Sequence, residues 1–447
     1  MIGIIWNLLS FILALGILIF IHEYGHFWVA RRNGIKVLKF SVGFGRTLHS
    51  WHDKQGTEYS IGLIPLGGYV RMLDGRIDDV SPVDEQYTFN NKKVTQRIAV
   101  VSAGPLANFI FAAFALFIML LIGVPAVKPV VGEISQDSIA QKAGLTTGDL
   151  ILSVEDNNVV DWQSANFAFL QQVGNDSFSV TVERNEQAID LILSSEQWNI
   201  DEGRVLSGLG ITPFSPKALL TLAHVVDGSP AEKAGLQVKD ELIELNNISL
   251  TSWPQTVEII SGLADQNVEA KVLRNGELIT FNLVPENKPT KDGFSRGYLG
   301  VSPNFENWPK GYVFDMQYGI LPALQKSFEK TWTLISLSVQ MIGKLIVGDI
   351  GLNNLSGPIS IAQGAGISAQ SGFVYFLSFL ALISVNLGVV NLLPLPVLDG
   401  GHLMYFFIEL IRGKPVSERV QEIGFRVGAF VLMMIMGIAI INDFARL

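Results

Sequence analysis

The chain has 447 residues, of which 49% are hydrophobic and only 16% charged, so it is too apolar for an ordinary soluble protein. It contains no cysteine, which excludes disulfides, thiolate zinc sites and cysteine-nucleophile catalysis. A formal net charge of -9, without a dense basic patch, argues against a nucleic-acid partner. We therefore expect a membrane protein with soluble domains, in which His, Asp or Glu must hold any metal.

Four apolar segments are long enough to cross a bilayer as helices, at about 4–30, 97–122, 373–393 and 425–442. The loop 31–97 carries eleven Lys or Arg against seven Asp or Glu, so the positive-inside rule places it in the cytoplasm. An even number of spans then places both termini and the long region 123–372 outside, which is the periplasm of a Gram-negative cell. The expected fold is a polytopic α-helical membrane protein with about four transmembrane helices.

The first apolar segment contains two histidines and a glutamate, in the run His22-Glu23-Tyr24-Gly25-His26. Because His22 and His26 are four residues apart, both rings project from one face of a helix, a spacing that suits a tetrahedral Zn2+ ion. Glu23 lies beside them and can act as general base. Ionisable groups in a membrane helix are costly and usually functional, which favours a metal site over a chance match. A signal peptide is disfavoured because positive charge follows the apolar run, at Arg31-Arg32.

Residues of about 57–73 form two short extended runs around Pro65 and the pair Gly67-Gly68, which predicts a hairpin with two apolar faces. Such a hairpin is buried against the membrane helices, is an edge that accepts an extended peptide, or is a plain cytoplasmic hairpin. In the second span, Gly104 and Asn108 share one helical face and predict close contact between helices.

An internal repeat occupies about 127–305. Residues 138–145 match residues 229–236 at an offset of 91, and the same offset pairs Asp149 with Asp240 and Trp162 with Trp253. Short alternating runs and an Asn-Gly turn predict two small β-rich domains, each with a helix or two. The repeated string resembles PDZ domains of bacterial envelope proteases, which bind peptide ends or edges by strand addition. The alternative is a pair of spacers without a ligand.

Beyond the repeat, residues 316–348 show helical spacing of apolar positions interrupted by charges, which predicts an amphipathic helix lying on the membrane. Residues 353–358 predict a turn-rich link to the third span.

A catalytic zinc requires a third protein ligand. Pro394 and Pro396 break the helix after the third span, and Asp399 emerges from that stretch as the favoured third ligand. His402 is its rival and Glu409 a more distant candidate, whereas the remaining histidines are expected at the solvent-exposed surface: His49, His52 and His224.

Four features together resemble the site-2 protease family. They are the motif from His22 to His26, the run Gly67-Gly68-Tyr69-Val70, the tandem PDZ-like repeat, and the run from Asn391 to His402. The resemblance implies a zinc-dependent intramembrane endopeptidase. It implies that the zinc ligands are His22, His26 and Asp399, and that Glu23 is the catalytic base. The substrate would be held by Asn386 and Asn391 and by a membrane-associated β-element that contains Gly67, Gly68, Tyr69 and Val70.

The resemblance also implies a substrate class and a location. The expected partner is a single-span anti-sigma factor of the bacterial inner membrane, already trimmed on its outer side, as part of a stress response. Remnant signal peptides are a second substrate class. The PDZ-like pair would exclude untrimmed substrates. The topology separately places the metal toward the cytoplasmic side of the bilayer, because 31–97 and 402–424 are both assigned inside and His22 to His26 lie near the inner end of their span.

The expected domain limits follow the spans and the repeat: a first half of the membrane core at 1–126, PDZ-like domains at 127–215 and 216–306, a linker with the amphipathic helix at 307–372, and a second half of the core at 373–447. Two other functions use the same residues. A non-catalytic scaffold has no need of Glu23 beside the ligands, and a metal transporter gives no role to tandem peptide-binding domains.

Overall fold

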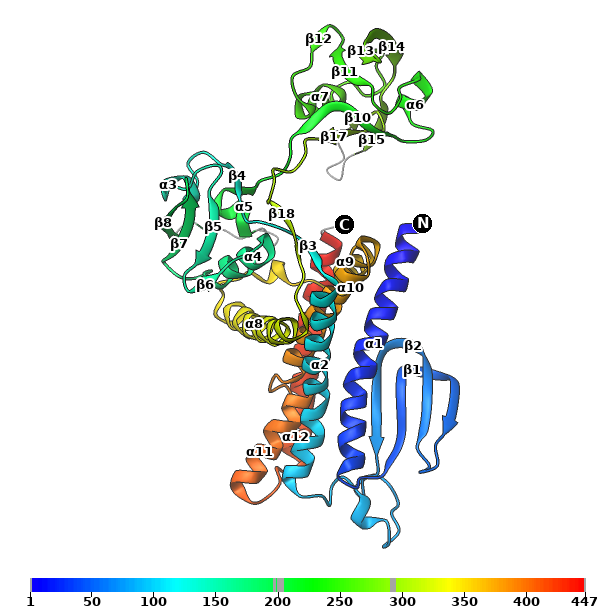
Figure 1. Cartoon of the computed structure of the whole chain (residues 1–447). Helices are drawn as coiled ribbons and strands as arrows, with labels where there is room; N and C mark the ends of the chain where they lie inside the picture. The colour runs from blue at the N-terminus through cyan, green and yellow to red at the C-terminus, as the bar shows by residue number, and fades with distance from the viewer. Residues whose placement is uncertain (1, 196–197, 199–204, 290–294, 446–447) are drawn as a thin grey trace.

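The computed structural model describes residues 2–195, 198, 205–289 and 295–445. In this part of the chain, four helices are long and apolar enough to cross a membrane, and they coincide with the four predicted segments. They are α1 (Ile2–Arg32), α2 (Val94–Ile122), α10 (Phe373–Asn391) and α12 (Glu418–Ala445). Both ends of the chain lie at the same end of this bundle, the end that faces two β-rich units (Figure 1).

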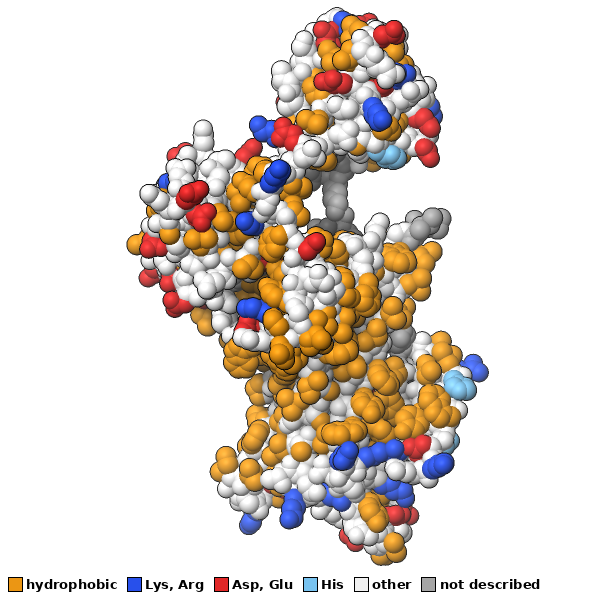
Figure 2. Space-filling view, in the orientation of Figure 1, with side chains coloured by type: hydrophobic (Ala, Val, Ile, Leu, Met, Phe, Trp, Pro, Cys, Tyr) orange, Lys and Arg blue, Asp and Glu red, His pale blue; other side chains and the backbone are white. Residues whose placement is uncertain are grey.

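Small residues allow the membrane helices to approach closely. A Cβ atom added at Gly25 of α1 would lie 2.8 Å from the Cβ of Ala107 in α2, and one added at Gly388 of α10 would lie 2.6 Å from the Phe109 ring. Close backbone approach through small residues is a common basis of helix association in membranes. Figure 2 shows hydrophobic side chains covering the bundle, with Lys and Arg gathered near the end opposite the β-rich units.

A separate sheet packs against α1. It is formed by β1 (Val37–His52) and β2 (Glu58–Met72), two long strands that pair antiparallel and change register several times. Phe40 pairs with Tyr59 on one side and with Val70 on the other. The first half of β1 therefore lies between the two halves of β2. The hairpin predicted within 57–73 is not what the chain forms, because a strand from outside that range separates its two arms. The closed hairpin lies instead between 47–52 and 58–62.

The two β-rich units repeat one architecture. In the first, a sheet of order β6-β5-β7-β8 lies beside the pair β4-β9, and in the second the order is β14-β13-β11-β10-β17. Each unit encloses its own hydrophobic core. The elements of the first unit are β4 (Val131–Ile134), α3 (Ile139–Lys142), β5 (Leu150–Val154), β6 (Asn157–Asn158), α4 (Trp162–Gln171), β7 (Ser177–Arg184), β8 (Gln187–Ser194), α5 (Val205–Leu209) and β9 (Ile211–Pro213). Those of the second are β10 (Ala218–Val225), α6 (Pro230–Ala234), β11 (Glu241–Leu245), β12 (Ile248–Ser249), α7 (Trp253–Ser261), β13 (Val268–Arg274), β14 (Glu277–Leu283), β15 (Glu286–Pro289), β16 (Ser295–Tyr298) and β17 (Val301–Phe305).

The repeat extends to buried ion pairs that the sequence comparison did not reveal. The carboxylate of Asp149 pairs with Arg184 at 2.7 Å, and that of Asp240 pairs with Arg274 at the same distance. Both aspartate side chains are only 1% exposed. The matched aspartates found by the offset are therefore structural anchors of the two units.

A narrow connection and the helix α8 (Ile320–Val347) link the units to the bundle. β3 (Val124–Val127) pairs with β18 (Val313–Met316), so the chain enters and leaves the units side by side. Then α8, close to the predicted amphipathic helix, lies across α2 (Figure 1). The remaining elements are η1 (Glu85–Tyr87), η2 (Leu352–Asn354), α9 (Pro358–Ser371) and α11 (Asp399–Arg412).

The helix α9 replaces the direct link that was predicted between 353–358 and the third span. Its first turn is capped by Asp443 of α12, whose carboxylate accepts hydrogen bonds from the backbone N–H groups of Gly357, Ile359 and Ser360 at 2.9, 2.8 and 3.1 Å. A carboxylate at a helix N-terminus satisfies donors that the helix itself leaves unpaired. The cap comes from a distant part of the chain, so the local sequence gives no sign of it.

Candidate metal centre

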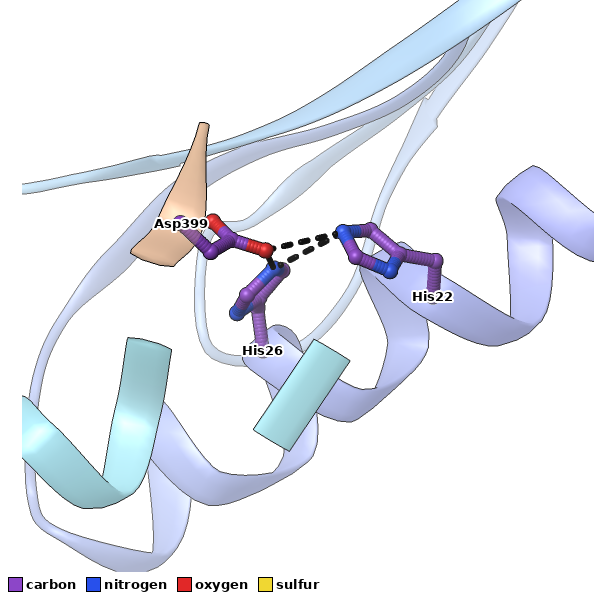
Figure 3. A group of neighbouring side chains, drawn as sticks. All are labelled: His22, His26 and Asp399. Atoms are coloured by element: carbon purple, nitrogen blue, oxygen red, sulfur yellow. Dashed lines mark hydrogen bonds and ion pairs between the residues drawn. The ribbon is translucent and has the colours of Figure 1, made fainter. Parts of the chain in front are cut away.

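His22, His26 and Asp399 come together from two distant parts of the chain (Figure 3). The histidines lie one turn apart on α1, with their Nε2 atoms separated by 3.2 Å. Asp399 is the first residue of α11, and its Oδ2 lies 3.2 Å from Nε2 of His22 and 3.4 Å from Nε2 of His26. Three potential ligand atoms therefore face one another within the space of a single ion.

The broken stretch after α10 places Asp399. That helix ends at Asn391 and α11 begins at Asp399, so residues 392–398 connect the two helices without regular structure. The two glycines that follow Asp399 pack directly on this turn. A Cβ added at Gly401 would lie 2.6 Å from the carbonyl carbon of Leu395, and one at Gly400 would lie 2.4 Å or less from backbone atoms of Leu392. Only glycine allows so close an approach, and the approach fixes the start of α11.

Hydrogen bonds on the far side of each ring orient the histidines. Nδ1 of His26 lies 2.9 Å from the carbonyl oxygen of Val100, which accepts its proton and leaves Nε2 with a free lone pair. Nδ1 of His22 lies 3.1 Å from the side-chain amide of Asn108. An asparagine amide can present either its oxygen or its nitrogen, and the oxygen facing His22 gives the second ring the same tautomer. Both Nε2 atoms then point lone pairs toward Asp399.

This arrangement fits a cation. Oδ2 of Asp399 is buried without a hydrogen-bond partner among the described residues, although two imidazole nitrogens face it. Two histidines and one carboxylate form a common protein ligand set of catalytic zinc, with the remaining position left for water. Gly104 of α2 keeps this space open, because a Cβ there would lie 2.9 Å from Cε1 of His22 and closer still to Nε2 of His26.

Glu23 lies next to the cluster and beside the sheet. Its side chain is half-buried, and a Cβ added at Gly68 of β2 would come within 2.9 Å of its Cγ atom. The Cβ added at Gly68 would also lie 2.8 Å from a methyl group of Ile19. The second half of β2 therefore passes directly over the part of α1 that carries Glu23.

The rival ligands lie outside the group. His402 is exposed, and the described residues place no ligand atom of it in the cluster. Glu409 is paired with Arg97 of α2, with 2.6 Å between Oε1 and Nη2. The other histidines, at positions 49, 52 and 224, are exposed as predicted.

The residues expected to hold a substrate lie on two elements, α10 and β2. Asn386 is on α10, where its side-chain oxygen accepts a hydrogen bond of 2.7 Å from Ser338 of α8, and Asn391 ends the same helix. Gly67, Gly68, Tyr69 and Val70 all belong to β2. The ring of Tyr69 stacks on Phe44 with 6.3 Å between centroids, and Gly67 packs against the same ring.

Sequence reasoning missed the groups that surround the ligands. Gly104 and Asn108 were expected to serve helix contact, whereas the structure also places one beside both imidazoles and the other against His22. An amide within an apolar span was a usable signal, because a buried polar group in a membrane requires a partner. The carbonyl of Val100 gave no signal, since every residue carries one.

Comparison with known proteins agrees with this geometry. The model of the family described as peptidase family M50 matches residues 10–435. The regulator of sigma-E protease RseP of Escherichia coli K12 is 47% identical over 451 residues, covering 100% of both chains, and the protease RseP of Yersinia pestis has the same identity and coverage. A regulator of sigma E protease from Haemophilus influenzae is 45% identical over 447 residues and 99% of each chain. The chain belongs to peptidase family M50, the site-2 protease family, and is a zinc metalloprotease.

Proposed function

We propose that His22, His26 and Asp399 hold the zinc ion and that Glu23 is the general base of an intramembrane endopeptidase. The observation that carries the proposal is the convergence of three ligand atoms, with Glu23 adjacent, on helices that lie within the membrane bundle. When bound, the ion would supply a Lewis acid that polarises the peptide carbonyl and lowers the pKa of water.

The chain's own residues account for the proton movements. Glu23 accepts the proton of the attacking water and delivers it to the nitrogen of the leaving amine. The hydrogen bond from His26 to Val100 and the contact of His22 with Asn108 hold both rings in place during these steps. The reaction is hydrolysis, so the peptide C–N bond breaks and water supplies a hydroxyl group to one product and a proton to the other.

The substrate would bind as an extended strand beside β2. The segment from Gly68 to Met72 pairs with β1 on one side, and no further strand pairs with its other side among the described residues. An unpaired strand edge can add a peptide through its backbone groups. A transmembrane helix hides its peptide bonds, so an extended substrate segment at this edge would expose one of them near Glu23. In this proposal Gly67, Gly68, Tyr69 and Val70 contact the substrate, and Asn386 and Asn391 hold it from α10.

The proposed substrates are single-span membrane proteins. The relatives named as regulators of sigma E support an anti-sigma factor, trimmed beforehand on its outer side, and remnant signal peptides are a second class. The protein would lie in the bacterial inner membrane with its termini and both β-rich units in the periplasm and its zinc nearer the cytoplasm. The two units would be PDZ-like domains, at 127–215 and 216–306, that restrict entry of untrimmed substrates.

Purified protein in detergent tests the proposal with a synthetic single-span peptide. We expect cleavage that a chelator abolishes and added zinc restores. Asp399→Ala should lose both zinc and activity, whereas His402→Ala should keep zinc. The ligand assignment is wrong if His402→Ala loses zinc and Asp399→Ala retains it. A scaffold or a transporter would bind zinc without cleaving the peptide.

A further inference from the structure

A cavity that contains none of the metal ligands lies between the first β-rich unit and the membrane helices. Its volume is about 620 Å³, within the usual range for a small-molecule site. Helices α2, α8, α9 and α10 line it on one side, and α4 with β6 lines it on the other. Neither the catalytic cluster nor the β1–β2 sheet contributes a residue to its lining.

The lining combines apolar and polar side chains. The membrane helices contribute Leu116, Phe379 and Leu382, and the first β-rich unit contributes Phe167 together with the amide and hydroxyl groups of Asn158 and Ser164. Further hydroxyl groups come from helices α8, α9 and α10, namely Thr333, Ser368, Ser371, Tyr375 and Ser378. A ligand that fills the cavity therefore meets both apolar and polar groups, as an amphipathic molecule would.

The apolar part of the lining lies below the surface of the bundle. Leu116 is six residues from the end of α2 at Ile122, and Leu382 is nine residues from the start of α10 at Phe373. At 1.5 Å per residue, these positions are roughly 9 and 13 Å inside the helix ends. The cavity thus spans the level at which headgroups meet hydrocarbon in a bilayer.

One cation in the lining lacks a charged partner. Lys330 of α8 has a single hydrogen-bond contact, 3.6 Å from its Nζ to the thioether of Met316, and no carboxylate lies within 4.0 Å of it in the described part of the chain. A thioether is a weak acceptor, and a partly buried ammonium without an anion is costly. Burial accordingly lowers the pKa of Lys330, although Asp161 opposes this effect from a distance.

An acid lies on the opposite wall. Asp156, just before β6, lines the cavity, is exposed and forms no ion pair among the described residues. The second acid, Asp161, is already engaged as the N-cap of α4, where it accepts a hydrogen bond of 2.7 Å from the backbone N–H of Ser164. The cavity thus presents one unpaired cation and one unpaired anion on separate walls.

We propose that this cavity binds one zwitterionic phospholipid with a primary amine in its headgroup. The acyl chains lie against the apolar side chains of the membrane helices, which we call the apolar floor (Leu116, Phe379 and Leu382). The phosphate pairs with Lys330, and the amine pairs with Asp156. The hydroxyl groups of α8, α9 and α10 in the lining contact the glycerol esters. Because the lipid would contact both the first β-rich unit and the membrane helices, it would fix the position of that unit relative to the membrane surface.

Native mass spectrometry of the full chain in detergent tests this assignment. Phosphatidylethanolamine should be retained as one molecule per chain, phosphatidylglycerol should bind more weakly, and diacylglycerol should not bind. Lys330→Gln should weaken phosphatidylethanolamine binding about tenfold, as expected for one charge-assisted hydrogen bond. Asp156→Asn should weaken phosphatidylethanolamine but not phosphatidylglycerol. Lys326→Gln is the matched control, since Lys326 lies one turn earlier on α8, pairs with Glu329 and does not line the cavity.

A cavity-filling variant and a soluble competitor test whether the lipid occupies this cavity. Ser378→Trp fills the cavity without removing a charge, so it should also displace the lipid, and the zinc content of each variant reports whether it is folded. Soluble phosphoethanolamine should compete at least a hundredfold less well than the lipid, because it cannot use the apolar floor. The proposal is overturned if Lys330→Gln and Lys326→Gln bind phosphatidylethanolamine equally, if the soluble headgroup competes as well as the lipid, or if a photo-crosslinker at position 378 captures a substrate peptide in place of lipid.

Discussion

Arg97 and Glu409 form an ion pair of 2.6 Å that joins α2 to α11, the helix that begins with Asp399. The two side chains are only 12% and 14% exposed, so the pair is shielded from water. Because α2 also carries Gly104, Val100 and Asn108, the pair ties the third ligand to the helix that supports the first two.

Glu409→Gln should therefore weaken zinc binding without removing a ligand. Removal of one partner from a buried pair costs about 3–5 kcal/mol, and part of that cost should appear as a displaced α11. Zinc affinity by competition with a chromogenic chelator measures the effect. Glu422→Gln is the control, because its pair with Arg426 on α12 is 63% and 76% exposed and such pairs contribute little. Equal affinities in the two variants would show that the pair does not position Asp399.

Gly104→Ala should reduce zinc affinity about tenfold or more, as expected when a methyl group is forced into a filled space. The added carbon would occupy the space beside both imidazoles. Gly16→Ala on α1 is the matched control, since no atom lies within 4 Å of its added Cβ. Full zinc loading of the Gly104 variant at limiting zinc would mean that the ion binds elsewhere.

The Asp149–Arg184 pair makes the stability of the first β-rich unit depend on pH. Although burial favours the neutral carboxyl, hydrogen bonds from Arg184 and Thr146 hold the pKa of Asp149 below its ordinary value of 3.8. A group with a lowered folded-state pKa contributes stability that is full above its unfolded pKa and lost as pH falls through its folded pKa. The protection of amide hydrogens in residues 131–194, relative to their intrinsic exchange rates at each pH, should therefore fall below about pH 4.

Asp149→Asn should remove this acid transition and destabilise the unit at neutral pH by roughly 1–3 kcal/mol, because it weakens a buried charge-assisted pair. Asp190→Asn removes a surface charge in the same sheet while keeping an oxygen that can accept the hydrogen bond from Thr181, and should leave the transition in place. If the acid transition persists unchanged in Asp149→Asn, a titratable group other than Asp149 causes it.

Lys344 of α8 forms hydrogen bonds with the first β-rich unit. Its ammonium donates hydrogen bonds to backbone carbonyls at the end of α4, to Gln171 at 2.6 Å and to Val173. Cations at helix C-termini satisfy carbonyls that lack partners. Lys344→Met should therefore broaden the distance distribution between spin labels placed on α4 and α8, and the chain provides a clean background because it has no native cysteine.

If the unit restricts substrate entry, Lys344→Met should also increase cleavage of an untrimmed single-span substrate relative to a trimmed one. Lys326→Met on the same helix serves as the control. If the distance distribution broadens but the preference for trimmed substrate is unchanged, the Lys344 hydrogen bonds hold the unit in place without contributing to substrate exclusion. An unchanged distribution would show that other contacts hold the unit.

Helical periodicity was sufficient to predict two of the three residues of the metal cluster. His22 and His26 share a face on any helix, and the hydrophobic length of each span is a local property of the sequence. The choice between Asp399 and His402 was not local. It depends on where α11 begins, and that start is set by the packing of Gly400 and Gly401 on the preceding turn.

The sequence failed where distant segments determine local structure. The range 57–73 contains hairpin signals, yet its two halves pair on opposite sides of β1 because Phe40 and its neighbours supply a better partner for each. The helix α9 has a weak apolar pattern with several glycines, and the cap that stabilises its start comes from Asp443. Neither arrangement can be predicted from residues close in sequence.

The central claim is that Glu23 is the base of a zinc peptidase whose ligands are His22, His26 and Asp399. The most direct measurement compares wild type and Glu23→Gln for zinc content and for cleavage of a membrane-embedded single-span peptide. We predict equal zinc, at one ion per chain, with cleavage reduced by at least about a thousandfold in the variant. Cleavage at the wild-type rate by zinc-loaded Glu23→Gln would contradict the account.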